Sequence, residues 1–95
     1  MQSSRIKELP RGIFKLKDLE ILDFPGNGLE NISNELVKLK NLRFINLQNN
    51  KLKSIPLGLL SLPHLNHLDI TKNEFPDWEK QKYRVKKSSN IVLLK

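Results

Sequence analysis

Two histidines and a nearby aspartate, His64, His67 and Asp69, are the residues of the chain best suited to catalysis. Histidine can transfer protons near neutral pH, and with a carboxylate it can bind zinc. On a β-strand, however, successive side chains point to opposite faces, so only His67 and Asp69 would share a face. The chain has no Cys and no Gly-rich phosphate loop, and no serine is arranged beside this pair as a nucleophile. The sequence therefore predicts solvated polar residues here, not an enzyme, and predicts neither a metal nor a cofactor.

The segment that carries His67 and Asp69 is one copy of an internal repeat. Four apolar positions and one Asn recur at an offset of 23 residues in three copies: Leu19, Leu22, Phe24, Asn27 and Leu29; Leu42, Ile45, Leu47, Asn50 and Leu52; Leu65, Leu68, Ile70, Asn73 and Phe75. In the middle of each copy, apolar residues alternate with polar neighbours, which is the period of a short strand with one buried face. The apolar residues that follow lie three to four apart, which indicates coil or a short helical turn. One such unit cannot bury its apolar side alone, so the units must stack.

The pattern L-x-x-L-x-L-x-x-N-x-L resembles the leucine-rich repeat family in its 23-residue variety. The resemblance implies an α/β fold, a short right-handed solenoid with a parallel concave β-sheet of three to four short strands and irregular or short helical convex segments. It also implies that Asn27, Asn50 and Asn73 form a structural ladder of hydrogen bonds where the backbone leaves each strand. Because this variety is common in intracellular proteins and the chain has no Cys, a cytoplasmic location is expected.

The whole chain, residues 1–95, is predicted to form one leucine-rich repeat domain. Its units are a partial repeat at 1–18, three repeats at 19–41, 42–64 and 65–87, and a degenerate C-terminal cap within 76–95.

The partial first repeat predicts an exposed edge of the sheet. Met1, Ser4 and Ile6 take the places of the first repeat's Phe24, Asn27 and Leu29, so the chain begins almost inside a strand. The strand at residues 21–23 would then be covered only by the incomplete strand at the start of the chain, and the uncovered edge of a sheet can pair with another chain. Two interpretations follow, that the chain is a piece of a longer array or that the edge is used for self-association.

The last segment, residues 76–95, keeps the repeat although it is rich in Lys and Arg. Trp78 and Val85 take the places of the core residues Ile55 and Leu62, so both are predicted to lie in the core. Ile91 and Leu93 take the places of Leu68 and Ile70, which predicts a fourth parallel strand over residues 90–94. Five cations are expected to face water: Lys80, Lys82, Arg84, Lys86 and Lys87.

The formal net charge of +7 allows two interpretations of this basic segment. It could dock on nucleic acid or on an anionic membrane, or it could be a solvated cap that blocks a sheet edge and keeps the protein soluble. The cap is the preferred interpretation, and nucleic acid is not an expected partner. No apolar run is long enough to predict membrane insertion.

The resemblance implies that function lies on the concave face, formed by strand residues that point away from the core. The candidate protein-binding residues are Ile21, Asp23, Phe44, Asn46, Gln48, His67, Asp69 and Thr71. Ile21, Phe44 and His67 would form an apolar to aromatic strip that could anchor a protein or peptide, or could simply stabilise the sheet. The predicted function is a non-catalytic protein-interaction module or scaffold. The alternatives are the basic electrostatic module and a regulatory fragment of a larger repeat-containing protein.

Overall fold

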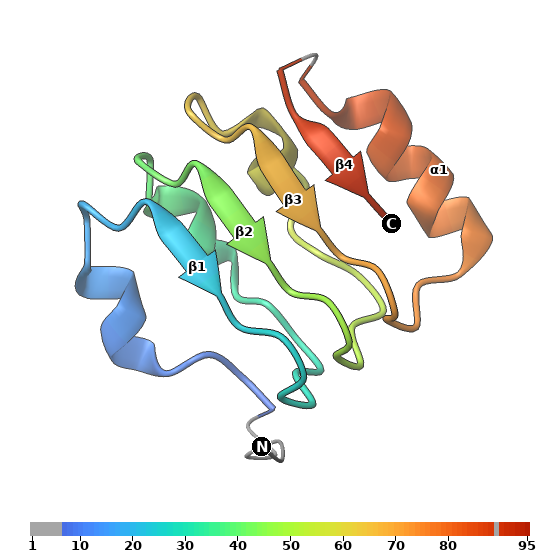
Figure 1. Ribbon diagram of the computed structural model, residues 1–95, viewed down its shortest axis with the longest axis horizontal. Helices are drawn as coiled ribbons and strands as arrows, with labels where there is room; N and C mark the ends of the chain where they lie inside the picture. Colours follow the sequence, from blue (N-terminus) through green and yellow to red (C-terminus); the bar gives the residue numbers. More distant parts are fainter. Residues whose placement is uncertain (1–6, 89) are drawn as a thin grey trace.

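The computed structural model describes residues 7–88 and 90–95, and its centre is one parallel β-sheet (Figure 1). The expectations for Met1, Ser4 and Ile6 fall outside the described residues. The strands are β1 (Ile21–Asp23), β2 (Phe44–Asn46), β3 (His67–Asp69) and β4 (Val92–Leu94), and they lie in the order β1-β2-β3-β4. The predicted α/β solenoid with a parallel sheet is therefore confirmed, including its fourth strand.

One short helix precedes each strand along the chain (Figure 1). Three are 3-10 helices, η1 (Arg11–Lys15), η2 (Asn34–Lys38) and η3 (Leu57–Ser61), and the fourth is the α-helix α1 (Asp77–Lys86). Prolines at positions 10 and 56 precede η1 and η3 with a backbone φ near that of a helix start. At the equivalent place before η2, the Ser33 hydroxyl accepts a hydrogen bond from Glu35 N. Each connection thus begins with a residue suited to a helix start.

The core lies between the sheet and these helices. Leu22, Ile45 and Leu68 are the central residues of the first three strands, and all are buried. Leu36 and Leu59 reach the same core from η2 and η3. Burial of one such side chain contributes roughly 1.5–3 kcal/mol, so the repeated leucines are the main stabilising feature of the stack.

The register of β4 differs from the predicted one. The first three strands pair at the 23-residue offset, but Leu68 pairs with Leu93 and Asp69 with Leu94, two residues later than expected. The connection before β4 contains the ten-residue α1 in place of a five-residue 3-10 helix, and an α-helix advances only about 1.5 Å per residue. Because a shift of two residues keeps each side chain on its face, Leu93 still packs against the core.

The predicted core positions of α1 are wrong. Trp78 and Val85 are 68% and 80% exposed, and the buried residues of the helix are Glu79 and Tyr83. The prediction used the spacing of the earlier connections, whereas an α-helix brings residues four apart to the same face. Of the five cations expected to face water, Lys82, Arg84 and Lys86 are exposed, whereas Lys80 and Lys87 are half-buried.

Tyr83 fixes α1 to the preceding repeat. Its hydroxyl donates a hydrogen bond to Glu79 Oε2 at 2.6 Å and accepts one from Ile55 N at 2.8 Å. Its ring and the Phe75 ring pack in a T-shaped arrangement, with centroids 5.6 Å apart. The buried carboxylate of Glu79 also pairs with Lys82 Nζ at 3.3 Å. Burial, together with the Glu79 carboxylate, raises the pKa of Tyr83 above its usual value, so the phenol stays protonated as a donor.

Candidate functional site

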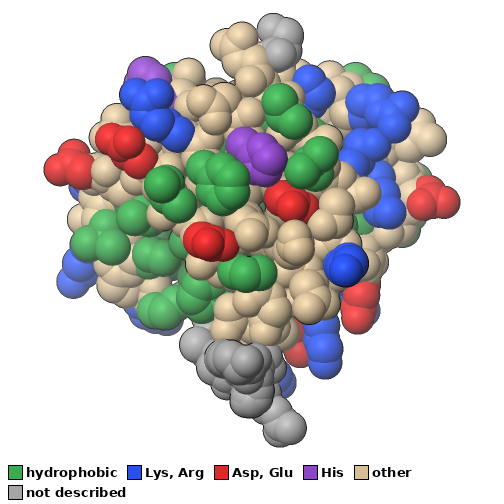
Figure 2. Space-filling model, viewed as in Figure 1, with side chains coloured by type: hydrophobic (Ala, Val, Ile, Leu, Met, Phe, Trp, Pro, Cys, Tyr) green, Lys and Arg blue, Asp and Glu red, His purple; other side chains and the backbone are tan. Residues whose placement is uncertain are grey.

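The exposed side of the sheet is the candidate site, and we call its eight outward side chains the sheet face. In each strand the middle residue is turned to the core and the two flanking residues point to the opposite side. The sheet face therefore has two rows, Ile21, Phe44, His67 and Val92 in the first and Asp23, Asn46, Asp69 and Leu94 in the second. Figure 2 shows this side of the molecule, with a histidine at its centre between hydrophobic and acidic side chains.

The first row is apolar and aromatic along its whole length. The rings of Phe44 and His67 stack with centroids 4.6 Å apart and an interplanar angle of 6°. Ile21 at one end is 61% exposed and Val92 at the other end is 57% exposed. Because neighbouring strands lie about 4.8 Å apart, the row extends for about 14 Å. The stacked pair is worth about 0.5–1.5 kcal/mol beyond its burial, so it holds the centre of the row in one arrangement.

The second row is polar except for Leu94, and its polar side chains bond to one another or to the neighbouring Gln48 and Thr71. Asn46 Nδ2 donates to Asp23 Oδ1 at 3.0 Å. Asp69 accepts from Gln48 Nε2 at 3.2 Å, from Thr71 Oγ1 at 2.7 Å and from Thr71 N at 3.0 Å. Gln48 N also donates to Asn46 Oδ1 at 3.1 Å, so the predicted polar residues Asp23, Asn46, Gln48, Asp69 and Thr71 lie in one network.

Hydrogen bonds control the charge of Asp69. Burial alone would raise the pKa of this carboxyl, but the Thr71 and Gln48 donors and the nearby His67 outweigh burial and lower the pKa below its usual value of 3.8. Asp69 is therefore a carboxylate at neutral pH and gives this part of the sheet face a negative charge.

Val92 and Leu94 belong to the sheet face but were not among the predicted residues. Their apolar character is visible in the sequence, but the 23-residue offset places Asn90 and Val92 beside His67 and Asp69 instead. Only the length of α1 sets the true register, and a helix of ten residues cannot be told from the short connections by apolar spacing alone.

The two histidines are separated. His67 lies in the first row, whereas His64 is exposed in the connection before β3. Among the described residues, no three His, Cys, Asp or Glu side chains are close enough together to hold a metal ion. No helix in the same part of the chain is long and apolar enough to span a membrane.

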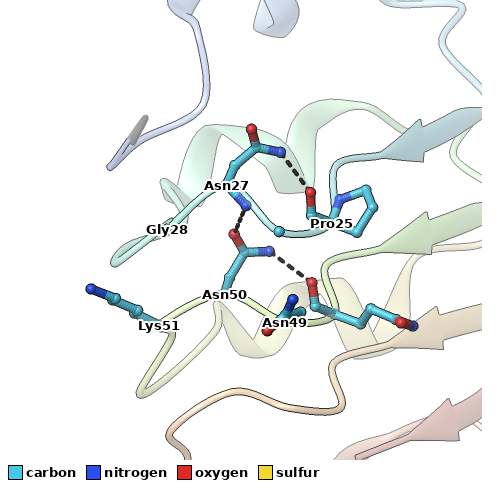
Figure 3. A pocket seen from close by; sticks show the side chains of 8 residues that line it. Pro25, Asn27, Gly28, Asn49, Asn50 and Lys51 are labelled. Carbon is cyan, nitrogen blue, oxygen red and sulfur yellow. Dashed lines mark hydrogen bonds between the residues drawn. The ribbon is translucent and has the colours of Figure 1, made fainter. Parts of the chain in front are cut away.

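At the carboxyl ends of the strands lies a cavity of about 720 Å³, with the amide of Asn50 in its wall (Figure 3). Asn50 Oδ1 accepts from Asn27 N and Leu29 N at 2.9 and 3.0 Å, and its Nδ2 donates to Phe24 O and Leu47 O at 3.1 and 3.0 Å. Both ends of the amide are thus used to join two neighbouring repeats. We interpret this cavity as the surface of the turns and not as a ligand site.

Asn73 makes the equivalent contacts one repeat later. Its Oδ1 accepts from Leu52 N at 2.9 Å, and its Nδ2 donates to Leu47 O and Ile70 O at 2.9 and 3.0 Å. Asn27, in the first repeat, donates from its Nδ2 to Pro25 O at 2.8 Å.

Comparisons with known proteins agree with this geometry. Residues 1–52 match a family model described as Leucine rich repeat, and residues 40–80 match a second one described as Leucine Rich repeats (2 copies). A solved leucine-rich repeat protein of Leptospira interrogans is similar to the chain, with a TM-score of 0.84 and 30% sequence identity. The similarity covers 94% of this chain but only 22% of the Leptospira protein. Nothing among the curated proteins matches.

Proposed function

The chain belongs to the leucine-rich repeat family, and from this we propose that it is a non-catalytic interaction module that binds a protein or peptide on its sheet face. Domains of this family generally mediate protein–protein interactions. The observation that carries the proposal is the continuous first row, in which exposed Ile21 and Val92 flank the stacked Phe44 and His67. Exposed apolar and aromatic side chains held in one arrangement are typical anchors of a protein interface.

The chemistry of the sheet face restricts the partner. An apolar side chain of the partner would pack on the first row, and hydrogen-bond donors or a cation would meet Asp23 and Asp69 in the second row. The first row is only about 14 Å long, so the sheet face is small for a standard interface, which buries about 800 Å² per partner. The sheet face therefore fits a short peptide segment.

Selection from a phage-displayed library of random peptides, followed by calorimetry with the peptides that bind, tests this proposal. We expect Phe44→Ala to weaken binding at least about tenfold, because it removes the central anchor. Leu16→Ser is the matched control, since Leu16 is an exposed apolar residue outside the sheet face and its loss should leave the affinity unchanged. Peptides whose affinity is the same for wild type and Phe44→Ala would contradict the proposal.

Self-association through the sheet edges is a second proposal. It is supported by the position of β1 and β4 as the outer strands of the described sheet, and by the exposed apolar residues Val92 and Leu94 on β4. A scaffold role and a cytoplasmic location remain predictions that rest on the composition and the repeat variety.

A further inference from the structure

The outward side of α1 carries an apolar ridge that the core does not use. Trp78 and Val85 are 68% and 80% exposed although both are large and apolar. They lie seven residues apart, two turns of the helix, and Lys82 lies between them on the same side. The Lys82 ammonium is 5.7 Å from the centroid of the Trp78 ring, a cation–π contact. We call these three residues the outer ridge.

Packing of the helix does not account for this exposure. The inner side of α1 is filled by Tyr83 and Glu79, and the Tyr83 hydroxyl bonds both to Glu79 and to Ile55 N. A polar residue at position 78 or 85 would leave every one of these contacts in place. The outer ridge therefore presents two apolar side chains to solvent for a reason other than the stability of the core.

Cations surround the outer ridge. Arg84 and Lys86 are exposed on either side of it, and Lys82 lies within it. Residues 77–87 contain five basic and two acidic side chains, and one of the acids, Glu79, is buried and paired with Lys82, which leaves four cations and Asp77. The whole chain carries a formal net charge of +7. The outer ridge thus combines apolar side chains with a positive field, which attracts an anionic surface.

We propose that the outer ridge docks the protein on an anionic lipid surface, with Trp78 and Val85 entering the headgroup region and the surrounding cations contacting lipid phosphates. Tryptophan places its ring at the level of lipid headgroups, and basic residues beside apolar ones are typical of helices that lie in a membrane interface. This site is separate from the sheet face, since α1 contributes no side chain to it.

A lipid surface fits the outer ridge better than an acidic protein does. The ridge is convex, and a fluid surface can close around protruding side chains where a folded partner would need a matching groove. Four of the five cations are lysines. The ammonium group of lysine is a flexible point charge that is attracted to the negative surface potential of a membrane, whereas bidentate binding of a protein carboxylate favours arginine.

The fluorescence of Trp78 tests the proposal directly, because it is the only tryptophan of the chain. Vesicles of phosphatidylcholine with about one quarter phosphatidylglycerol should shift its emission to shorter wavelength and should carry the protein down on centrifugation. Pure phosphatidylcholine vesicles should do neither, and added salt should reverse the binding. Absence of an emission shift with anionic vesicles would overturn the proposal.

Variants locate the binding surface. Neutralising Arg84 and Lys86 together, as Arg84→Gln and Lys86→Gln, should weaken vesicle binding about 30-fold, since each basic residue near such a surface contributes about fivefold. Lys15→Gln with Lys17→Gln makes the same change of charge at two exposed positions at and beside η1, which η2 and η3 separate from α1, and should have less than about a threefold effect. Val85→Ser should weaken binding and leave Trp78 as the reporter. Equal losses in both double variants would show that net charge alone drives binding and would overturn the proposal.

A soluble acidic polymer separates lipid from protein as the partner class. Polyglutamate has the negative charge of an acidic protein but no lipid interface. If polyglutamate shifts the Trp78 emission as strongly as the anionic vesicles do, the outer ridge binds acidic polypeptides and the lipid assignment is wrong. If only the vesicles shift it, the lipid assignment holds.

Discussion

Asn50 joins two repeats through its side chain, with three hydrogen bonds to the backbone of the preceding repeat. Its amide bonds to backbone groups of its own repeat and of the preceding repeat. It is 6% exposed, so water cannot replace these contacts. A side chain with both a donor and an acceptor is therefore required at this position.

Replacing this amide tests its role. We expect Asn50→Ala to lower the free energy of unfolding by about 3 kcal/mol, because several buried backbone groups lose their partner. Asn31→Ala, at an exposed position, is the control and should change the stability by less than about 0.5 kcal/mol. Urea denaturation followed by circular dichroism measures both values. Equal effects of the two substitutions would contradict this role for Asn50.

Asp69 predicts a pH dependence of stability. Its pKa is lowered in the folded chain, so protons bind more readily to the unfolded chain at acidic pH. The stabilisation is fully present above the usual value of 3.8 and is lost as the pH falls through the folded-state pKa. The stability difference between wild type and Asp69→Asn should accordingly shrink below pH 3.8, as measured by urea denaturation at a series of pH values. A stability difference between wild type and Asp69→Asn that is constant with pH would contradict the lowered pKa of Asp69. Asp18→Asn is the control at an exposed position.

At the scale of single residues, the repeat alone predicts which side chains become neighbours. The 23-residue offset places Ile21, Phe44 and His67 in line, and the strands pair these three residues. Whether they bind a partner remains a prediction. Val92 could not be assigned to the same row, because its position depends on the length of a connection that departs from the repeat.

Among the elements, α1 is the one that the repeat pattern does not describe. The three 3-10 helices follow the apolar spacing of their repeats, whereas α1 exposes Trp78 and buries Tyr83. The 23-residue offset predicts a core position for Trp78, and the structure shows it exposed instead. The hydrogen bonds of the Tyr83 hydroxyl to Glu79 and Ile55 decide the outcome, and such a network over 28 residues is invisible to a pattern of apolar positions.

Removing the Tyr83 hydroxyl tests this attachment of α1. Tyr83→Phe keeps the ring but leaves Ile55 N and the buried Glu79 carboxylate without this partner, so we expect a loss of about 1–3 kcal/mol of stability. Trp78→Phe is the matched aromatic control at an exposed position of the same helix and should cost less than about 0.5 kcal/mol. Thermal and urea unfolding report both. A larger loss of stability for Trp78→Phe than for Tyr83→Phe would show that α1 turns Trp78, and not Tyr83, to the core.

For the whole molecule, the outer strands and the net charge have opposite effects on association. β1 and β4 are the outer strands of the described sheet, which favours pairing between copies, whereas the formal charge of +7 repels them. Sedimentation velocity over a concentration series should therefore show weak association that increases with salt, because salt screens the repulsion. Leu94→Lys adds a charge to the outer strand β4 and should abolish this association. A monomer at every concentration and salt would rule out pairing through the edges.

The proposal that the sheet face is the binding surface is tested most directly by nuclear magnetic resonance, from the chemical-shift changes of the backbone amides when a peptide is added. Uniformly 15N-labelled protein would be titrated with a peptide selected by phage display, and the amide signals that move would be assigned. Binding on the sheet face predicts that the largest changes lie in β1 to β4, centred on Phe44 and His67, with little change in η1 to η3. Changes confined to α1, or to the helices behind the sheet, would contradict the claim and would place the interaction on another surface.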